Sequence, residues 1–268
     1  MIESFASHAA IAIDNARLYE EALEKRRMED ELRVANRIQR SLLLSDFPES
    51  DWYDVHALNV PFRGVGGDYY EFFETQWGTL GFAVGDVSGK GIPAAMLMAT
   101  LQAAFLAATQ TSEDLAFVCG HVNNFLFQRT SPERYATFFV GLLRPDVQMQ
   151  FVNAGHNPAL LVRGDAEPKQ LMGGGMPLGL FADREYEVQT VQLEADDVVV
   201  VFSDGVTEAN NPDEEEYGEE ALASVVVAER NQDADGMGKA VFDAVSVFST
   251  GAPQHDDLTL MIIKHTAS

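Results

Sequence analysis

The chain has 268 residues and a formal net charge of −24, with 46% apolar residues and a single cysteine. So large an acidic excess excludes nucleic acid and anionic lipid as the main partner, because phosphate backbones are bound through lysine and arginine. The lone cysteine excludes an internal disulfide, and we find no run of about 18 apolar residues, so we expect a cytoplasmic protein that does not span a membrane.

Residues 2–44 carry apolar side chains at helical spacing. The first seam has alternating steps of three and four and consists of Ile2, Phe5, Ala9, Ala12, Ala16, Tyr19 and Leu23. After the charged stretch Glu24–Arg27, a second seam follows out of phase, with Met28, Leu32, Ala35 and Leu42. The pattern predicts one long helix or two in succession, ended by Pro48. We favour a coiled coil that forms a homodimer; the alternative is an amphipathic helix lying on its own domain.

From residue 51 onward, short apolar segments of strand type predominate. The predicted strands are Val55–Val60, Tyr70–Glu74, Thr79–Val84, Thr137–Leu143, Met149–Asn153, Ala159–Val162, Val188–Leu193, Val198–Phe202 and Leu258–Ile263. The predicted helices are Pro93–Thr109, Ser112–Arg129, Gly218–Arg230 and Asp235–Val247. Strands come mostly in adjacent sets and helices in pairs. This order favours an α+β fold of two packed antiparallel sheets flanked by helices over a parallel doubly wound sheet.

Aspartates lie in four separated turns, most of them beside a predicted strand. These turns are Gly66–Asp68, Gly85–Gly89, Ser203–Gly205 and His255–Asp257. Mg²⁺ and Mn²⁺ prefer oxygen ligands, and a neighbouring glycine lets the backbone come close to an ion. One Asp-Gly turn alone indicates a β-turn, but four separate aspartate-containing turns favour a carboxylate metal site. Bound cations would reverse the local field, so a phosphate substrate is compatible with the acidic charge.

Three other features are interpreted as structural. Cys119 lies in an apolar helix without a nearby basic residue, which indicates a buried thiol rather than a nucleophile. His156 follows a strand in the turn Gly155–Pro158, and we expect it to belong to the turn or to support the site rather than bind metal. The acidic stretch Asn210–Glu216 is interpreted as a solvated loop.

Six motifs follow one another within residues 45–265: Val65–Tyr70, Gly85–Gly91, Asn153–Pro158, Pro177–Gly179, Ser203–Ala209 and Asp256–Thr259. Taken together and in this order, they resemble the bacterial SpoIIE/RsbU branch of the metal-dependent type 2C (PPM) serine/threonine protein phosphatases. Residues 1–20 resemble the last helix of a GAF sensor domain, and residues 21–46 a coiled-coil linker. Residues 47–268 would then be the phosphatase domain, and the chain the output half of a longer protein.

The resemblance implies a site for two divalent cations, Mn²⁺ or Mg²⁺. Asp86 matches the aspartate that bridges the two ions. Asp68 and the carbonyl of Val87 match ligands of the second ion, and Asp204 and Asp256 match ligands of the first. Asp86 and Asp68 would thereby position the water that attacks phosphorus, with no protein nucleophile.

Four further residues are expected near these ligands. Asp257 stands where relatives often carry asparagine. It is expected to support the metal ligands without binding the ions itself, as are Gly67 and Gly205. Arg63 is the nearest candidate for the phosphate-binding arginine of eukaryotic relatives.

The implied activity is hydrolysis of phosphoserine or phosphothreonine on a protein. In this branch the usual substrate is an anti-sigma-factor antagonist with a STAS-type domain. A twist of residues 2–44 would regulate the site through the predicted helix Pro93–Thr109. Two alternatives stay open: a non-catalytic dimeric signalling module with a phosphatase-like fold, and a hydrolase of small phosphate esters or nucleotides.

Overall fold

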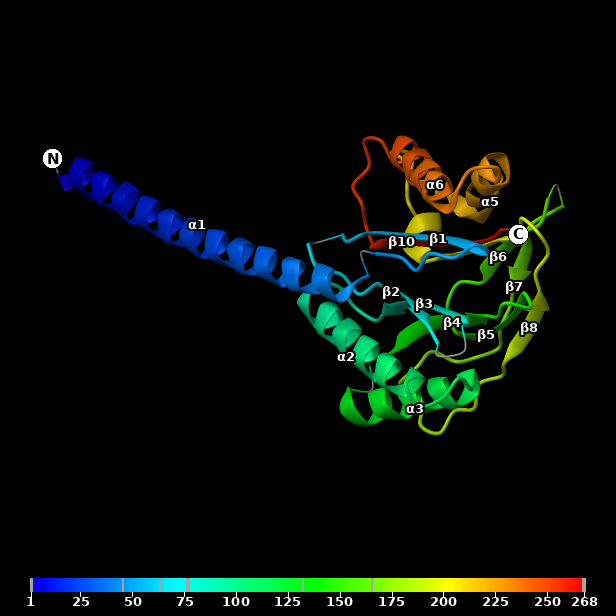
Figure 1. Ribbon diagram of the computed structural model, residues 1–268. Helices are drawn as coiled ribbons and strands as arrows, with labels where there is room; N and C mark the ends of the chain where they lie inside the picture. Colours follow the sequence, from blue (N-terminus) through cyan, green and yellow to red (C-terminus); the bar gives the residue numbers. More distant parts are fainter. Residues whose placement is uncertain are drawn as a thin grey trace.

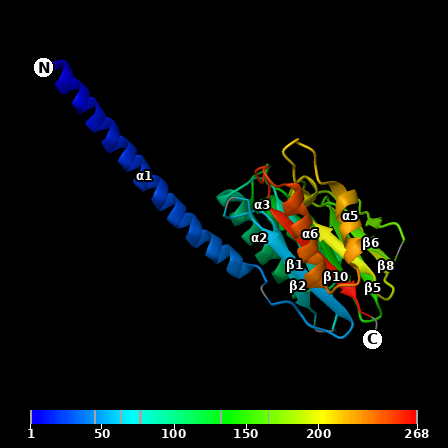
Figure 2. The same ribbon diagram turned by 90° about the horizontal axis from the view of Figure 1, so that it is seen from above.

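The computed structural model describes residues 2–44, 46–62, 64–75, 78–131, 133–164 and 166–266, and in the first helix it describes the side chains of residue 8 and of residues 11 onward. Two five-stranded antiparallel sheets lie face to face, with helices on both outer faces (Figure 1). The long helix α1 (Ile2–Leu42) extends away from this body, as the view from above also shows (Figure 2). The α+β sandwich with an N-terminal long helix is therefore confirmed.

The first sheet has the strand order β1-β10-β9-β6-β7 and lies under α5 (Gly218–Glu229) and α6 (Ala234–Phe248). Its strands are β1 (Tyr53–Val60), β6 (Ala159–Val162), β7 (Lys169–Leu171), β9 (Val198–Phe202) and β10 (Leu258–His265). All five residues of β9 are buried. Val199 and Val201 face the other sheet, whereas Val198, Val200 and Phe202 face the helices. Because side chains alternate along a strand, burial on both faces requires a continuous apolar run.

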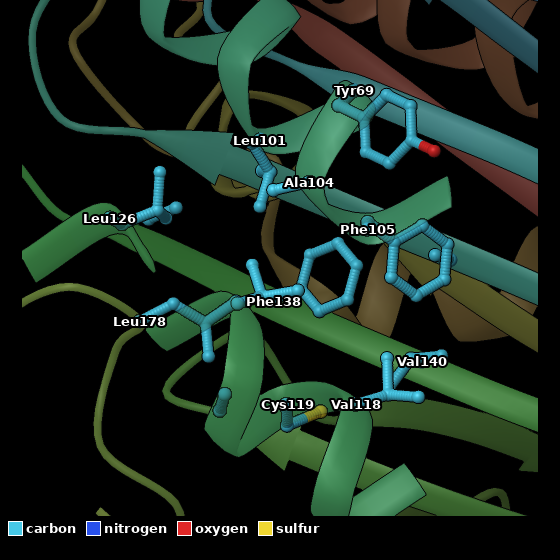
Figure 3. Close-up of a cluster of buried hydrophobic side chains, with 14 of the residues drawn as sticks. Tyr69, Leu101, Ala104, Phe105, Val118, Cys119, Leu126, Phe138, Val140 and Leu178 are labelled. Carbon is cyan, nitrogen blue, oxygen red and sulfur yellow. The ribbon is translucent and has the colours of Figure 1, made fainter. Parts of the chain in front are cut away.

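The second sheet has the order β2-β3-β4-β5-β8 and is covered by α2 (Ile92–Thr109) and α3 (Leu115–Arg129). Its strands are β2 (Tyr69–Glu74), β3 (Leu80–Val87), β4 (Ala136–Leu143), β5 (Gln148–Ala154) and β8 (Gln189–Gln192). Between this sheet and its helices, the rings of Tyr69, Phe105 and Phe138 have centroids 5.1 to 6.4 Å apart (Figure 3). Tyr69 directly follows Asp68, so this core fixes the segment that carries a predicted ligand.

Helix α2 is long and apolar enough to cross a membrane by length and composition, which the expectation of no such stretch had overlooked. Its side chains Leu97, Leu101 and Phe105 are buried in the core shared with α3 and the second sheet. Gln102 on the same face donates to the carbonyl of Leu42 at 2.5 Å. These contacts make α2 a core helix of the domain.

The main differences from the predicted elements are one strand boundary and two elements that were not predicted. The strand β3 continues past Val84 to Val87, because Asp86 pairs with Thr137 of β4. Asp86 is therefore a strand residue, and the turn predicted around it is wrong. The edge strand β7 and the short helix α4 (Asp204–Thr207) were not predicted.

Helix α1 is one continuous helix that passes through Glu24–Arg27 without interruption. All described side chains up to Glu31 are exposed, so the alternative of a helix lying on its own domain is wrong for this part. Only the last turns touch the body, where Leu32 and Ala35 are half-buried and Gln39 is buried. The coiled coil stays a prediction, and Tyr19, Leu23 and Met28 of the predicted seams are exposed and available for it.

Candidate metal centre

Four of the predicted aspartates come together at one end of the sandwich, two from each sheet. Asp68 directly precedes β2, and Asp86 lies near the end of the neighbouring β3. From the first sheet, Asp204 begins α4 directly after β9, and Asp256 lies in the loop before β10. The four carboxyls lie close together, because Asp204, Asp256 and Asp68 all affect the pKa of Asp86. The candidate site thus spans the junction between the two sheets.

Burial and mutual repulsion perturb these carboxyls. Burial, followed by the charges of Asp204 and Asp256, raises the pKa of Asp86 to about 7, against an opposing hydrogen bond with Asp68. Burial and then the charge of Asp86 raise the pKa of Asp68 well above its usual range, although the hydroxyl of Thr259 donates to it at 2.5 Å. Burial also raises the pKa of Asp204. Carboxyls crowded in this way favour a cation, which relieves both the repulsion and the cost of burying charge.

The donor set fits a hard divalent cation. Every candidate ligand offers oxygen, as Mg²⁺ and Mn²⁺ require. A Cβ added at Gly67 would lie 3.0 Å from the carbonyl oxygen of Val87 and 3.3 Å from Oδ1 of Asp86, so glycine keeps the approach to both oxygens open. Within the described ranges, no three side chains of His, Cys, Asp or Glu already stand in ligand geometry. The carboxylates are gathered at one place, and their oxygen atoms are of the type that such a cation requires.

Asp257 has a different position from the other acids. Its carboxylate accepts backbone hydrogen bonds from Phe62 at 2.7 Å and from Gly67 at 2.6 Å. A Cβ at Gly66 would lie 2.3 Å from the same carboxylate, and one at Gly205 would lie 2.0 Å from the Asp257 carbonyl oxygen. Asp257 therefore fixes the loop that leads to Asp68, and the absence of a Cβ at Gly205 lets α4 pack closely against Asp257.

Lys90 is a basic residue at this site that the sequence analysis did not select. Its Nζ donates to Oδ2 of Asp256 at 2.6 Å and to the carbonyl of His255 at 2.7 Å. It stands between Gly89 and Gly91, whose φ values of 100° and 72° favour glycine. The signal was present in the sequence, as the one basic residue of the Gly85–Gly91 motif. Arg63, the predicted phosphate-binding residue, lies outside the described residues.

His156 and Cys119 are both buried. The Nδ1 of His156 is 2.9 Å from the hydroxyl of Thr137, the residue paired with Asp86. Burial lowers the pKa of His156 to about 4, so the ring is neutral near pH 7. Burial raises the pKa of Cys119, which is enclosed in the core of α3. Neither side chain is placed to attack a substrate.

The fold and the clustered carboxylates define a candidate PP2C-type phosphatase domain, and comparison with known proteins identifies its family. The family model described as Stage II sporulation protein E (SpoIIE) matches residues 76–266. The chain therefore belongs to the SpoIIE family.

Two curated relatives extend this comparison. "Phosphoserine phosphatase RsbU" of Bacillus subtilis is 29% identical over 246 residues, which cover 88% of this chain and 70% of that protein. "Protein IcfG" of Synechocystis is 22% identical over 261 residues, which cover 87% of this chain and 41% of that protein. The chain thus spans less than half the length of the second relative.

Two solved structures share the fold. The "SiaA-PP2C domain of Pseudomonas aeruginosa" has a TM-score of 0.80 at 22% identity and covers 90% of this chain and 98% of that one. RsbX, solved in complex with magnesium, has a TM-score of 0.62 at 16% identity and covers 82% of this chain and 99% of that one.

Proposed function

We propose that this protein is a metal-dependent phosphatase that hydrolyses phosphoserine or phosphothreonine on a protein. The observation that carries the proposal is the gathering of Asp68, Asp86, Asp204 and Asp256 at one end of the sandwich, with the pKa of three of them raised. Membership of the SpoIIE family supports the reaction class. A relative named as a phosphoserine phosphatase supports the substrate class.

In this proposal the chain's own residues hold and orient the reacting groups. Asp86 would bridge two cations, Asp204 and Asp256 would hold one of them, and Asp68 with the Val87 carbonyl would hold the other. When bound, two divalent cations lower the pKa of water and offset the negative charge of a phosphoryl group. The half-exposed ammonium of Lys90, next to Asp256, would bind a phosphoryl oxygen. No side-chain nucleophile is required.

Turnover of p-nitrophenyl phosphate and of a phosphoserine protein, each with Mn²⁺, Mg²⁺ or EDTA, tests the proposal. Hydrolysis of both that EDTA abolishes would support a protein phosphatase. Preference for the small ester over every phosphoprotein would favour the alternative of a small-ester hydrolase. Absence of turnover with either metal, despite metal binding in a direct titration, would favour a non-catalytic signalling module.

Replacing Lys90 with methionine is expected to raise KM for p-nitrophenyl phosphate about tenfold, the effect of losing one charge-assisted hydrogen bond. The inhibition constant of inorganic phosphate should rise by a similar factor, because the ammonium would contact the phosphoryl group itself. Lys239→Met removes an exposed lysine of α6 that pairs with Asp235, and it should change neither constant. Unchanged KM and phosphate inhibition in the Lys90 variant would contradict this role.

The substrate proposed here is an anti-sigma-factor antagonist with a STAS-type domain. The RsbU relative and a structural relative described as "The bacterial stressosome" support that class of pathway. We further propose that residues 1–20 are the last helix of a GAF-like domain and residues 21–46 a linker that dimerises through its exposed apolar side chains. The protein would act in the cytoplasm.

Regulation through α1 is also proposed, on a contact that the sequence did not predict. The side-chain amide of Gln39 donates to the carbonyl of Gly66 at 2.6 Å, and its oxygen accepts from the Gly66 N–H at 3.0 Å. Asn36 donates to the carbonyl of Gly64 one turn earlier. The base of α1 therefore holds the loop that ends at Asp68, and a movement of the helix would displace this ligand.

Replacing Gln39 with alanine is expected to raise about tenfold the Mn²⁺ concentration that gives half-maximal activity. The change leaves two buried backbone groups of Gly66 without partners, which costs about 1–3 kcal/mol and loosens the loop before Asp68. Arg40→Ala, an exposed change on the same turn, is the matched control and should leave the metal requirement unaltered. An unaltered Mn²⁺ requirement in the Gln39 variant would show that the base of α1 does not influence the metal centre.

A further inference from the structure

A pocket of about 590 Å³ opens beside the candidate metal centre, and most of its lining residues have no part in the proposed reaction. Its walls come from the end of α6, the loop that leads to β10, and the turn after α4, which lie together in Figure 1. Lys90, Gly205 and Asp256 line both this pocket and the centre. A group bound in the pocket would therefore lie next to a phosphoryl group at the metals.

The walls of this pocket are fixed by their own hydrogen bonds. The side chain of Gln254 donates to the carbonyls of Val60 and Asp256, at 3.1 and 2.7 Å. In the turn after α4, Asn210 pairs with Glu216, and the Tyr217 N–H donates to the Ala209 carbonyl at 2.9 Å. The acidic stretch Asn210–Glu216 is thus an ordered wall as well as a solvated loop. A preformed pocket of this size is typical of a binding site.

The pocket combines an apolar floor with an acidic rim. Phe242, Val245 and Leu258 supply the floor. Glu208, Glu216 and Asp256 supply three carboxylates to the walls, against the single ammonium of Lys90. Lys90 is already bonded to Asp256, and among the residues that the structure describes neither glutamate forms an ion pair. The two glutamates therefore leave an uncompensated negative charge above an apolar surface.

We propose that this pocket, here called the acidic pocket, binds a lysine or arginine side chain that the phosphoprotein substrate presents beside its phosphorylated residue. The aliphatic stem of such a side chain would pack on Phe242 and Val245, and its charged head would reach Glu208 and Glu216. An acidic or second phosphorylated side chain would be repelled. The inference rests on the proposed phosphatase function and adds a specificity determinant to it.

Phosphoserine peptides test the acidic pocket, because a flexible peptide can place a side chain in the pocket while its phosphoserine is at the metal centre. In a neutral, alanine-rich peptide, a single arginine is placed at each position in turn on both sides of the phosphoserine. A second series places a single leucine at the same positions. With Mn²⁺ present, we expect arginine at one or two positions to raise kcat/KM about tenfold over alanine, as for one charge-assisted hydrogen bond. Leucine should give less than half of that gain.

Glu216→Gln should remove most of the arginine gain and leave turnover of p-nitrophenyl phosphate unchanged. Asp213→Asn removes an equal charge from the same turn outside the pocket and should retain the gain. Hydrolysis without any arginine preference, an equal gain from leucine, or a preference kept in Glu216→Gln would overturn the inference and leave the phosphatase function standing. Absence of hydrolysis of both the peptides and p-nitrophenyl phosphate would overturn both.

Discussion

Replacing Asp86 with asparagine is expected to lower metal-dependent turnover of p-nitrophenyl phosphate by a factor on the order of 10²–10³, the range seen when one preorganised electrostatic group is removed from an active site. Asp86 is the carboxylate that Asp68, Asp204 and Asp256 all influence or contact, so no neighbour can take its place. Mn²⁺ binding measured by calorimetry should weaken in parallel. The exposed Asp243→Asn on α6 is the matched control and should keep both properties.

The same variant should be more stable than the wild type in EDTA near neutral pH. The pKa of Asp86 is about 7 in the fold and 3.8 ordinarily, so the folded state binds this proton more tightly than the unfolded state does. The stability that results is fully present below the ordinary pKa and is lost as the pH rises to the pKa of the folded state. Asparagine stays neutral at every pH. Its advantage should be absent below about pH 4 and reach on the order of 2–4 kcal/mol above pH 7. Urea unfolding at several pH values would measure the difference, and a variant that is less stable at pH 7 would contradict it.

The second large effect is expected at Arg163, far from the metal centre. Its guanidinium donates to the carboxylate of Asp197 at 2.6 to 3.1 Å, and also to Glu194 and to the carbonyl of Gln192. Asp197 is fully buried. The cluster joins the end of β6 in the first sheet to the turn that follows β8 of the second, so it ties the two layers together.

Arg163→Met should lower the free energy of unfolding by about 3 kcal/mol, because a buried carboxylate without its partner is strongly unfavourable. For a domain of this size the melting temperature should fall by about 6–12 °C. Arg17→Met breaks the exposed pair with Glu21 on α1 and should cost less than about 1 kcal/mol. Adding Asp197→Asn to Arg163→Met should recover part of the loss. A melting temperature unchanged by Arg163→Met would show that Asp197 does not need its partner.

The sequence predicted the paired sheets well where the pattern was strong. Val198–Phe202 was predicted with its observed bounds, because burial on both faces leaves an unmistakable apolar run. The edge strand Lys169–Leu171 was missed, since only its last residue is buried and no alternation is visible in three residues. At Asp86, local turn signals outweighed the pairing with Thr137, which a single sequence does not display.

The site was predictable to the extent that it consists of motif residues. Asp68, Asp86 and Asp204 could be found because each stands beside a glycine near a strand end, and Asp256 because it lies two residues before a predicted strand. Gln39 could not, since its partner is a backbone amide 27 residues away and no side-chain pattern records such a bond. The acidic pocket was missed for a similar reason: Glu208, Phe242 and Asp256 come together only through the packing of α6 against the loop before β10.

The length of α1 determines which movements can reach the metal centre. A helix of 41 residues is about 60 Å long, and Gln39 lies only about 4.5 Å from its end at Leu42. If the helix pivots at its base, a 10 Å sideways swing of the far end moves Gln39 by less than about 1 Å. A rotation of about 30° around the helix axis instead carries a side chain at a radius of about 5–6 Å through about 3 Å, which is enough to break its hydrogen bonds. A sideways movement of the far end of α1 therefore leaves the loop before Asp68 in place, whereas torsion of the helix displaces it.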